Sequence, residues 1–309
     1  MQAITKIDSS RQREILEILL HHGWDYMRQI LTIGKAERVD IPPPAILRTI
    51  LTDLGPVYVK LGQLLSTRPD LLPLEYIEAL SDLQSNVPPI DWTEIEAILI
   101  QQLPQPPTEI FTEIGHQPVA AGSIAQTHRA VLKSGRTVAL KVQRPGIDRL
   151  VARDIALIEQ IAELLSGTEF GKRYDLVSLA AEFSTALQAE LDFTQEARYT
   201  ETLRQNLLAG RWFDPTKIMV PEIDRELSTQ KLLVLEWLDG VPILAAQLTG
   251  KSSAGNIQQE RQAITVLCFR AFFQQYLVDG LFHADPHPGH HLDKIGCRRS
   301  EERRVGKEC

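Results

Sequence analysis

The stretch EIFTEIGHQPVAAGSIAQTHRAVLKSGRTVALKVQRPG, residues 109–146, is where the hydrophobic pattern changes from helical to alternating. Its β-branched residues alternate with polar ones around two turn signals, Ala-Ala-Gly-Ser at 120–123 and Lys-Ser-Gly-Arg at 133–136. Alternation with a period of two residues is typical of half-buried strands. The stretch therefore predicts three antiparallel strands.

Apolar residues recur with a helical period on both sides of this stretch. The expected helices cover residues 11–33, 44–83 with a break at TRPDLLP, one proline-bounded segment within 86–107, 147–165, 176–208 and 257–279. Two more short strands are expected in KIMVPEI (217–223) and KLLVLEWL (231–238). The pattern predicts an α+β protein in which an antiparallel sheet of five strands follows an all-helical N-terminal region.

The composition narrows the class of protein. The chain has 309 residues, 43% of them hydrophobic, enough for a globular protein with one large or two medium cores. A net charge of −7, from 33 basic and 40 acidic residues mixed along the chain, gives no indication of the clustered basic face that nucleic-acid binding requires. Cys268, Cys297 and Cys309 lack paired spacing, and no export signal or membrane-spanning run is found, so we expect a cytoplasmic protein.

The segment HADPHPGH, residues 283–290, packs chemistry-bearing side chains into a short loop. His283 and His287 are four residues apart, as in a helical zinc site, but Pro286 and Pro288 forbid that helix. A catalytic loop and a turn with a buried histidine both remain open on these residues alone.

Lys141 stands in the apolar run VALKVQ on the third expected strand. A buried ammonium needs a negative partner to keep its proton, whereas a lysine at the rim of the sheet would only reach water. Partners are available in LQAELDFTQEARYT, residues 187–200. On one continuous helix Glu190 and Asp192 would project to nearly opposite sides, and Asp192 and Glu196 would share a face. A solvated acidic helix is the alternative.

Five ordered motifs resemble the signatures of the UbiB family, the ADCK or aarF atypical kinase-like proteins. They are VKLGQLLSTRPDLLP (59–73), AAGSIAQTH (120–128), ALKVQRPG (139–146), ELDFTQEA (190–197) and FHADPHPG (282–289), within a resemblance that spans residues 44–289. The resemblance implies a protein-kinase-like fold. Its expected parts are a helical extension at 1–107, an N-lobe at 108–240 and a partial C-lobe at 241–298. Residues 299–309 resemble a translated read-through of a sequencing-library adapter, so we expect them to be a non-native tail.

The resemblance also implies roles for the extension. Lys60 and Gln63 would belong to the KxGQ motif, and Lys60 would pair with Glu190, the first acid of an ExD motif. Asp192 would complete that motif near the nucleotide phosphates. Lys60 also shares a helical face with apolar residues, where a charge needs a reason. We expect a buried or half-buried ion pair, with a loss of about 3–5 kcal/mol when one partner is removed.

For the nucleotide, the resemblance implies that Lys141 contacts the α- and β-phosphates and is held by Glu196. The loop Ala120, Ala121, Gly122 and Ser123 would replace the glycine-rich loop of other kinases. Gly122 departs from the family's commonest alanine pattern and would let the backbone approach phosphate more closely. Backbone groups of Glu236 and Leu238 would contact adenine.

The resemblance assigns Asp285 to the catalytic loop, where it would orient or deprotonate an attacking hydroxyl or water. His290 stands where the family has a magnesium-binding asparagine, and imidazole is a poor substitute for a hard oxygen ligand. The family's Asp-Phe-Gly motif does not follow in this sequence. We therefore expect a fragment with little or no magnesium-dependent ATPase activity.

The function implied for the parent protein is ATP hydrolysis or small-molecule phosphotransfer that supports isoprenoid-quinone biosynthesis at a membrane surface. ATP and Mg²⁺ would be the cofactors. A quinone precursor or lipid and quinone-biosynthesis proteins would be the partners. The alternative class is a scaffold in which ATP switches lipid or protein affinity without turnover.

Overall fold

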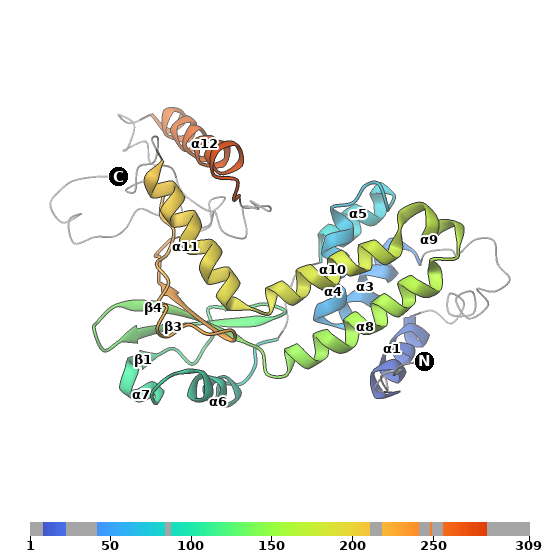
Figure 1. Ribbon diagram of the computed structural model, residues 1–309, viewed down its shortest axis with the longest axis horizontal. Coiled ribbons are helices and arrows are strands. Elements are labelled where there is room, and N and C mark those ends of the chain that lie inside the picture. Colours follow the sequence, from blue (N-terminus) through green and yellow to red (C-terminus); the bar gives the residue numbers. More distant parts are fainter. Residues whose placement is uncertain are drawn as a thin grey trace. The chain divides into compact units, whose positions relative to one another are not determined.

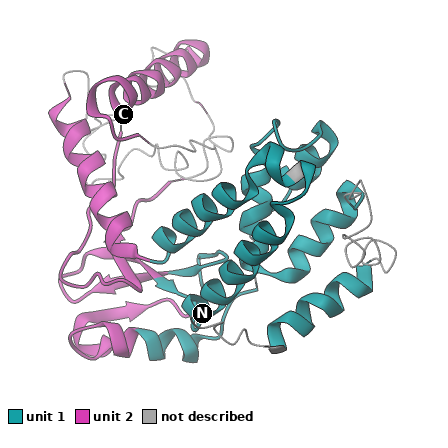
Figure 2. Ribbon diagram, turned by 45° about the vertical axis from the view of Figure 1, so that its right-hand side comes forward, with its two compact units in different colours: residues 1–98, 117–127, 142–191 teal, residues 99–116, 128–141, 192–309 magenta. Residues whose placement is uncertain are grey.

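The computed structural model describes residues 9–22, 42–83, 88–210, 218–240, 248 and 256–282 (Figure 1). They divide between two compact units, coloured separately in Figure 2. Unit 1 comprises residues 1–98, 117–127 and 142–191, and unit 2 comprises residues 99–116, 128–141 and 192–309. The domain boundaries expected from the sequence stay a prediction.

Unit 1 is built mainly of helices. They are α1 (Ser9–His22), α3 (Pro44–Leu54), α4 (Pro56–Ser66), α5 (Leu74–Ser81), α8 (Ile147–Leu165), α9 (Glu169–Tyr174) and α10 (Leu176–Glu190). Pro44 and Pro56 open α3 and α4, where a missing N–H costs nothing. Gly55 separates these two helices with a φ of 99°, a conformation that glycine adopts without strain.

The core of unit 1 lies between α3, α4 and α5 and the pair α8 and α10. Its buried side chains include Ile50, Leu54, Val57, Leu80, Val151, Ile155, Phe183 and Leu187. None of the helices among the described residues is long and apolar enough to cross a bilayer.

A buried ion pair fastens α1 to this core. The Arg11 guanidinium donates to both carboxylate oxygens of Asp154 on α8, each at 2.8 Å, and to the carbonyl of Leu54 at 2.6 Å. Arg11 is 7% exposed and Asp154 is fully buried. Hydrogen bonding to Asp154 raises the pKa of Arg11, so the guanidinium stays charged. One side chain thus ties three helices together.

The sheet has strand order β1-β3-β4-β5, with β2 also paired to β3. The strands are β1 (Phe111–Ile114), β2 (Ala120–Ala121), β3 (Ala125–Leu132), β4 (Thr137–Gln143) and β5 (Leu232–Glu236). β1 and β2 both run antiparallel to β3. The remaining helices are α6 (Trp92–Gln102), α7 (Pro107–Ile110), α11 (Phe193–Ala209) and α12 (Ile257–Gln274), which continues as the π-helical η3 (Gln275–Asp279).

The mixed helical and antiparallel architecture expected from the sequence is confirmed, with four corrections. The helix expected from residue 44 to the break at TRPDLLP is divided at Gly55 into α3 and α4. Ala120 and Ala121 form the short strand β2 where only a turn was expected, so the 109–146 stretch contains four strands. Of KIMVPEI, the described residues 218–223 contribute only an isolated bridge, at Ile223. The single helix expected over 176–208 is two helices that meet at Leu191 and Asp192.

We predict that Arg11→Met lowers the free energy of unfolding by about 3–5 kcal/mol, because Asp154 would keep a buried charge without its partner. Chemical denaturation of the purified chain measures this loss. Arg13→Met is the matched control, since Arg13 is exposed on the same helix. Equal effects of the two substitutions would contradict the role given to the buried pair.

Candidate functional site

Lys141 and Glu196 form an ion pair within unit 2. The Lys141 ammonium on β4 donates to both carboxylate oxygens of Glu196 on α11, at 2.8 and 2.7 Å. It also lies 5.0 Å from the ring centroid of Phe193, within cation–π range. The two charged side chains are 32% and 37% exposed. The predicted contact is confirmed, and it leaves the ammonium partly accessible.

Local sequence explains why Glu196 meets Lys141. Asp192 caps the N-terminus of α11 and accepts hydrogen bonds from the backbone N–H and the hydroxyl of Thr194, at 3.0 and 2.6 Å. The bond from the Thr194 side chain lowers the pKa of Asp192. Phe193 is 1% exposed and anchors the first turn. The cap and the anchor therefore fix where α11 starts and place Glu196 one turn into the helix.

The cap also corrects the geometry expected for the ExD acids. Glu190 is the last residue of α10, whereas Asp192 has φ −108° and ψ 93° and is not helical. The argument from 100° per residue therefore does not apply across this break. Glu190 belongs to unit 1 and Asp192 to unit 2. The role of Asp192 near phosphates stays a prediction.

Lys60 on α4 and Glu190 at the end of α10 form the expected ion pair, with 2.7 Å between Nζ and Oε1. The two side chains are 38% and 39% exposed. The pairing is confirmed, but the expected loss of 3–5 kcal/mol is too large. An ion pair so accessible to water contributes about 0.2–1 kcal/mol.

The glycine and the glutamine of the KxGQ motif both have structural roles, and sequence reasoning supplied none for Gly62. A Cβ at Gly62 would come within 2.3 Å of Leu83 and 2.9 Å of Leu51, both buried in the core. Gln63 donates from Nε2 to the carbonyl of Leu83, at 2.9 Å. An isolated glycine inside a helical pattern is the signal that could have pointed to this close packing.

The 120–123 segment consists of β2 and the start of the turn to β3. Ala120 is exposed, and Ala121, Gly122 and Ser123 are partly buried. Gly122 donates its N–H to the carbonyl of Ala125, at 2.8 Å. A Cβ at Gly122 would meet that carbonyl at 3.5 Å, an ordinary contact. The local structure therefore accepts an alanine here, and packing does not explain the glycine.

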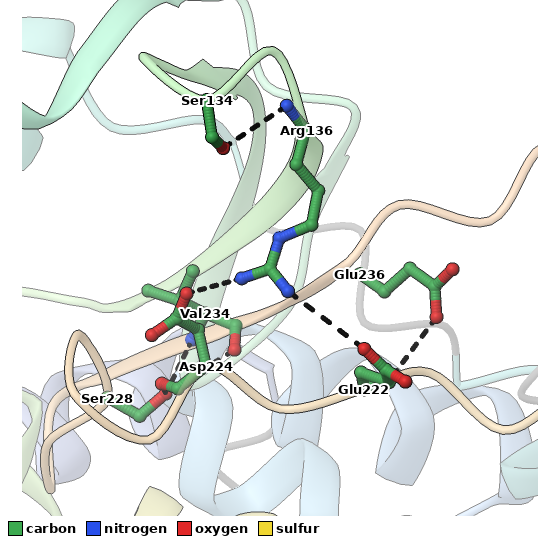
Figure 3. Close-up of polar contacts among 7 residues, drawn as sticks. All are labelled: Ser134, Arg136, Glu222, Asp224, Ser228, Val234 and Glu236. Atoms are coloured by element: carbon green, nitrogen blue, oxygen red, sulfur yellow. Dashed lines mark hydrogen bonds and ion pairs between the residues drawn. The ribbon is translucent and has the colours of Figure 1, made fainter.

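An ionic network fixes the segment that carries Glu236 (Figure 3). Arg136, in the β3–β4 turn, contacts the carboxylates of Asp224 and Glu222 at 2.5 and 4.0 Å. Glu222 also pairs with Arg204 of α11, at 2.6 Å. Sequence reasoning missed this network because its members are far apart in the chain and follow no local pattern.

Glu236 and Glu222 are further joined through their backbones. Glu236 donates its N–H to the Glu222 carbonyl at 2.8 Å, and the Glu236 carboxylate accepts from the Glu222 N–H at 3.3 Å. The Glu236 N–H is therefore engaged. Leu238 is 7% exposed, and among the described residues none accepts a hydrogen bond from its N–H. The adenine contacts expected of these two residues stay a prediction.

The remaining site predictions lie outside the described residues. They concern Asp285 and His290, both beyond residue 282. Within the described ranges, no three His, Cys, Asp or Glu side chains are grouped so that they could hold a metal ion.

Comparison with known proteins gives consistent matches. A family model described as the ABC1 atypical kinase-like domain matches residues 82–293. The uncharacterised protein slr0889 of Synechocystis sp. is 58% identical over 279 residues, covering 90% of this chain and 68% of that protein. A protein of Cellvibrio japonicus named probable protein kinase UbiB is 38% identical over 244 residues, covering 79% of this chain and 42% of that protein.

One solved structure, a complex of Rv3197 with erythromycin from Mycobacterium tuberculosis, has a TM-score of 0.51 and 28% sequence identity. The match covers 78% of this chain and 58% of that one. Together with the family match, it supports a kinase-like fold of mixed helices and antiparallel strands. The chain thus spans between about two fifths and about two thirds of the length of the relatives named here.

We predict that Lys60→Ala and Glu190→Ala each lower the free energy of unfolding by less than about 1 kcal/mol, because water screens the pair. A double-mutant cycle should give a coupling energy of about 0.2–1 kcal/mol. Lys60→Ala combined with Glu159→Ala, an exposed site on α8, is the additive control. A coupling energy of several kcal/mol would mean that the pair is buried in solution.

A second prediction compares two glycines. Gly122→Ala should change the free energy of unfolding by no more than about 0.5 kcal/mol, because its Cβ fits. Gly62→Ala should cost about 1 kcal/mol net, because overpacking against Leu83 outweighs the better helix propensity of alanine. Urea titration of both variants measures the difference. The reverse order would contradict the packing described around Gly62.

Proposed function

Because this chain belongs to the ABC1 atypical kinase-like family, we propose that it binds ATP beside Lys141, in a protein that transfers or hydrolyses the γ-phosphate. The observation that carries the proposal is the bidentate contact between Lys141 and Glu196. A lysine oriented by a helical glutamate presents a fixed point charge, which suits phosphate oxygens.

Three local features fit the nucleotide. The Lys141 side chain is partly exposed and can reach a ligand without leaving Glu196. The small residues at 120–123 allow phosphate to approach the backbone. The N–H of Leu238, without an acceptor among the described residues, is available to adenine.

We propose Mg²⁺ as the companion of ATP, to neutralise charge between the phosphates. Magnesium in such sites takes one or two protein carboxylates together with phosphate oxygens and water. Asp192 offers a partly exposed carboxylate, and its lowered pKa favours the ionised form. His290 would be a weaker ligand, and Asp285 would orient or deprotonate the attacking hydroxyl or water.

We further propose ATP hydrolysis or small-molecule phosphotransfer, with an isoprenoid-quinone precursor or related lipid as the acceptor or regulator. The support is the UbiB name carried by relatives at 36–38% identity. The helical extension with Lys60 would take the place where other kinases receive protein substrates. A peripheral position at the cytoplasmic membrane surface, beside quinone-biosynthesis proteins, fits this chemistry.

The test is the affinity of the chain for ATP with Mg²⁺, measured by calorimetry. Lys141→Met should weaken binding about 10- to 100-fold, since one charge-assisted contact contributes about 1.5–3 kcal/mol. Lys133→Met, at an exposed lysine in the β3–β4 turn, is the matched control. Unchanged affinity in Lys141→Met, or no binding by the unsubstituted chain, would refute the proposed nucleotide site.

Turnover is tested separately, in a full-length relative supplied with ATP. Phosphate release that rises when prenylated phenols are added would support lipid-stimulated hydrolysis. ATP binding that changes lipid affinity without phosphate release would instead favour a nucleotide-gated scaffold.

A further inference from the structure

Arg144, just after β4, donates hydrogen bonds to the backbone carbonyls of three residues in unit 1. Its own N–H donates to Ile124 at 2.8 Å, its Nε to Gly122 at 2.8 Å and its Nη2 to Pro88 at 2.9 Å. The planar guanidinium suits this arrangement because its donors diverge in one plane. One side chain therefore ties the 120–124 segment to the 88–90 segment.

A second side chain makes the same connection. Gln126 is fully buried on β3, and its amide oxygen accepts from the Ile90 N–H at 2.8 Å. Its amide nitrogen donates to the Ile90 carbonyl at 3.2 Å. Both Gln126 and Arg144 therefore hydrogen-bond to the 88–90 segment. This second anchor restrains the Arg144 side chain where it bonds to Gly122.

The bond to Gly122 has a directional consequence. In a trans peptide the C=O and the following N–H point in opposite directions. Because Arg144 fixes the Gly122 carbonyl, it also fixes the direction of the Ser123 N–H, away from the guanidinium. Among the described residues, none accepts a hydrogen bond from that N–H. Oriented backbone N–H groups are the donors that phosphate-binding loops present.

We propose that Arg144 is a positioning residue that holds the Ser123 N–H in a fixed orientation as a donor to a nucleotide phosphate, using the 88–90 segment as its anchor. The inference rests on the proposed function, because the turn must receive a phosphate for this orientation to affect binding. It assigns Arg144 no contact with the nucleotide itself.

Two measurements on the full chain test this role. Hydrogen–deuterium exchange without nucleotide reports the order of the 118–126 segment, and calorimetry compares ATP with adenosine. Arg144→Met should speed exchange in that segment and weaken ATP binding about ten-fold while adenosine binding stays unchanged. A general folding defect would weaken both ligands, so the phosphate-specific loss separates positioning from mere stability.

The controls separate the outcomes. Arg149→Met removes an exposed arginine from α8 and should match the unsubstituted chain in both measurements. Arg144→Lys keeps the charge but cannot span two carbonyls, so it should give a smaller ATP-specific loss. This variant keeps the test informative if the Met variant misfolds. Unchanged exchange in both Arg144 variants, or equal losses for ATP and adenosine, would overturn the inference.

The same measurements distinguish a failure of the proposed nucleotide binding from a failure of the positioning role. An unsubstituted chain that bound no ATP would refute nucleotide binding, and the positioning role with it. If the unsubstituted chain binds ATP and Arg144→Met leaves that affinity unchanged, only the positioning role is overturned.

Discussion

The charged amine of Lys141 is the constraint on which the architecture of unit 2 depends. It stands on a strand whose neighbouring residues Val138, Leu140 and Val142 are fully buried, so it needs a carboxylate close by. Glu196 meets that need only because α11 begins at Phe193 and points its first turns at β4. The helix start, its cap and the packing of Phe193 together place one carboxylate against one ammonium.

How much the sequence could predict depends on how local each signal is. That Lys141 needs a negatively charged partner follows from its apolar neighbours in the sequence. The bounds of α8 were predicted correctly because its apolar residues form a continuous stripe. The break at Asp192 was missed because this capping aspartate ends the run of helical backbone, whereas the spacing of the apolar residues continues across it. Arg11 and Asp154 are 143 positions apart, so no pattern along the chain could join them.

Two glycines show how a family resemblance can be given physical content. Gly62, within the KxGQ pattern, packs so closely against Leu83 and Leu51 that a Cβ would have to displace their side chains. Gly122, where the family most often has alanine, has room for one. The first glycine is therefore explained by folding. Folding does not explain Gly122, so we look for an explanation in a ligand that approaches the backbone at this position.

The route of the chain limits how this protein can be divided. It passes between the two units after residues 98, 116, 127, 141 and 191, and three of these passages lie inside α6, β3 and β4. No single cut yields either unit intact, and a cut within β3 or β4 would sever the sheet. Neither unit is formed by one continuous stretch of the chain, so the ion pairs at Lys60 and at Lys141 belong to units that share an interleaved backbone.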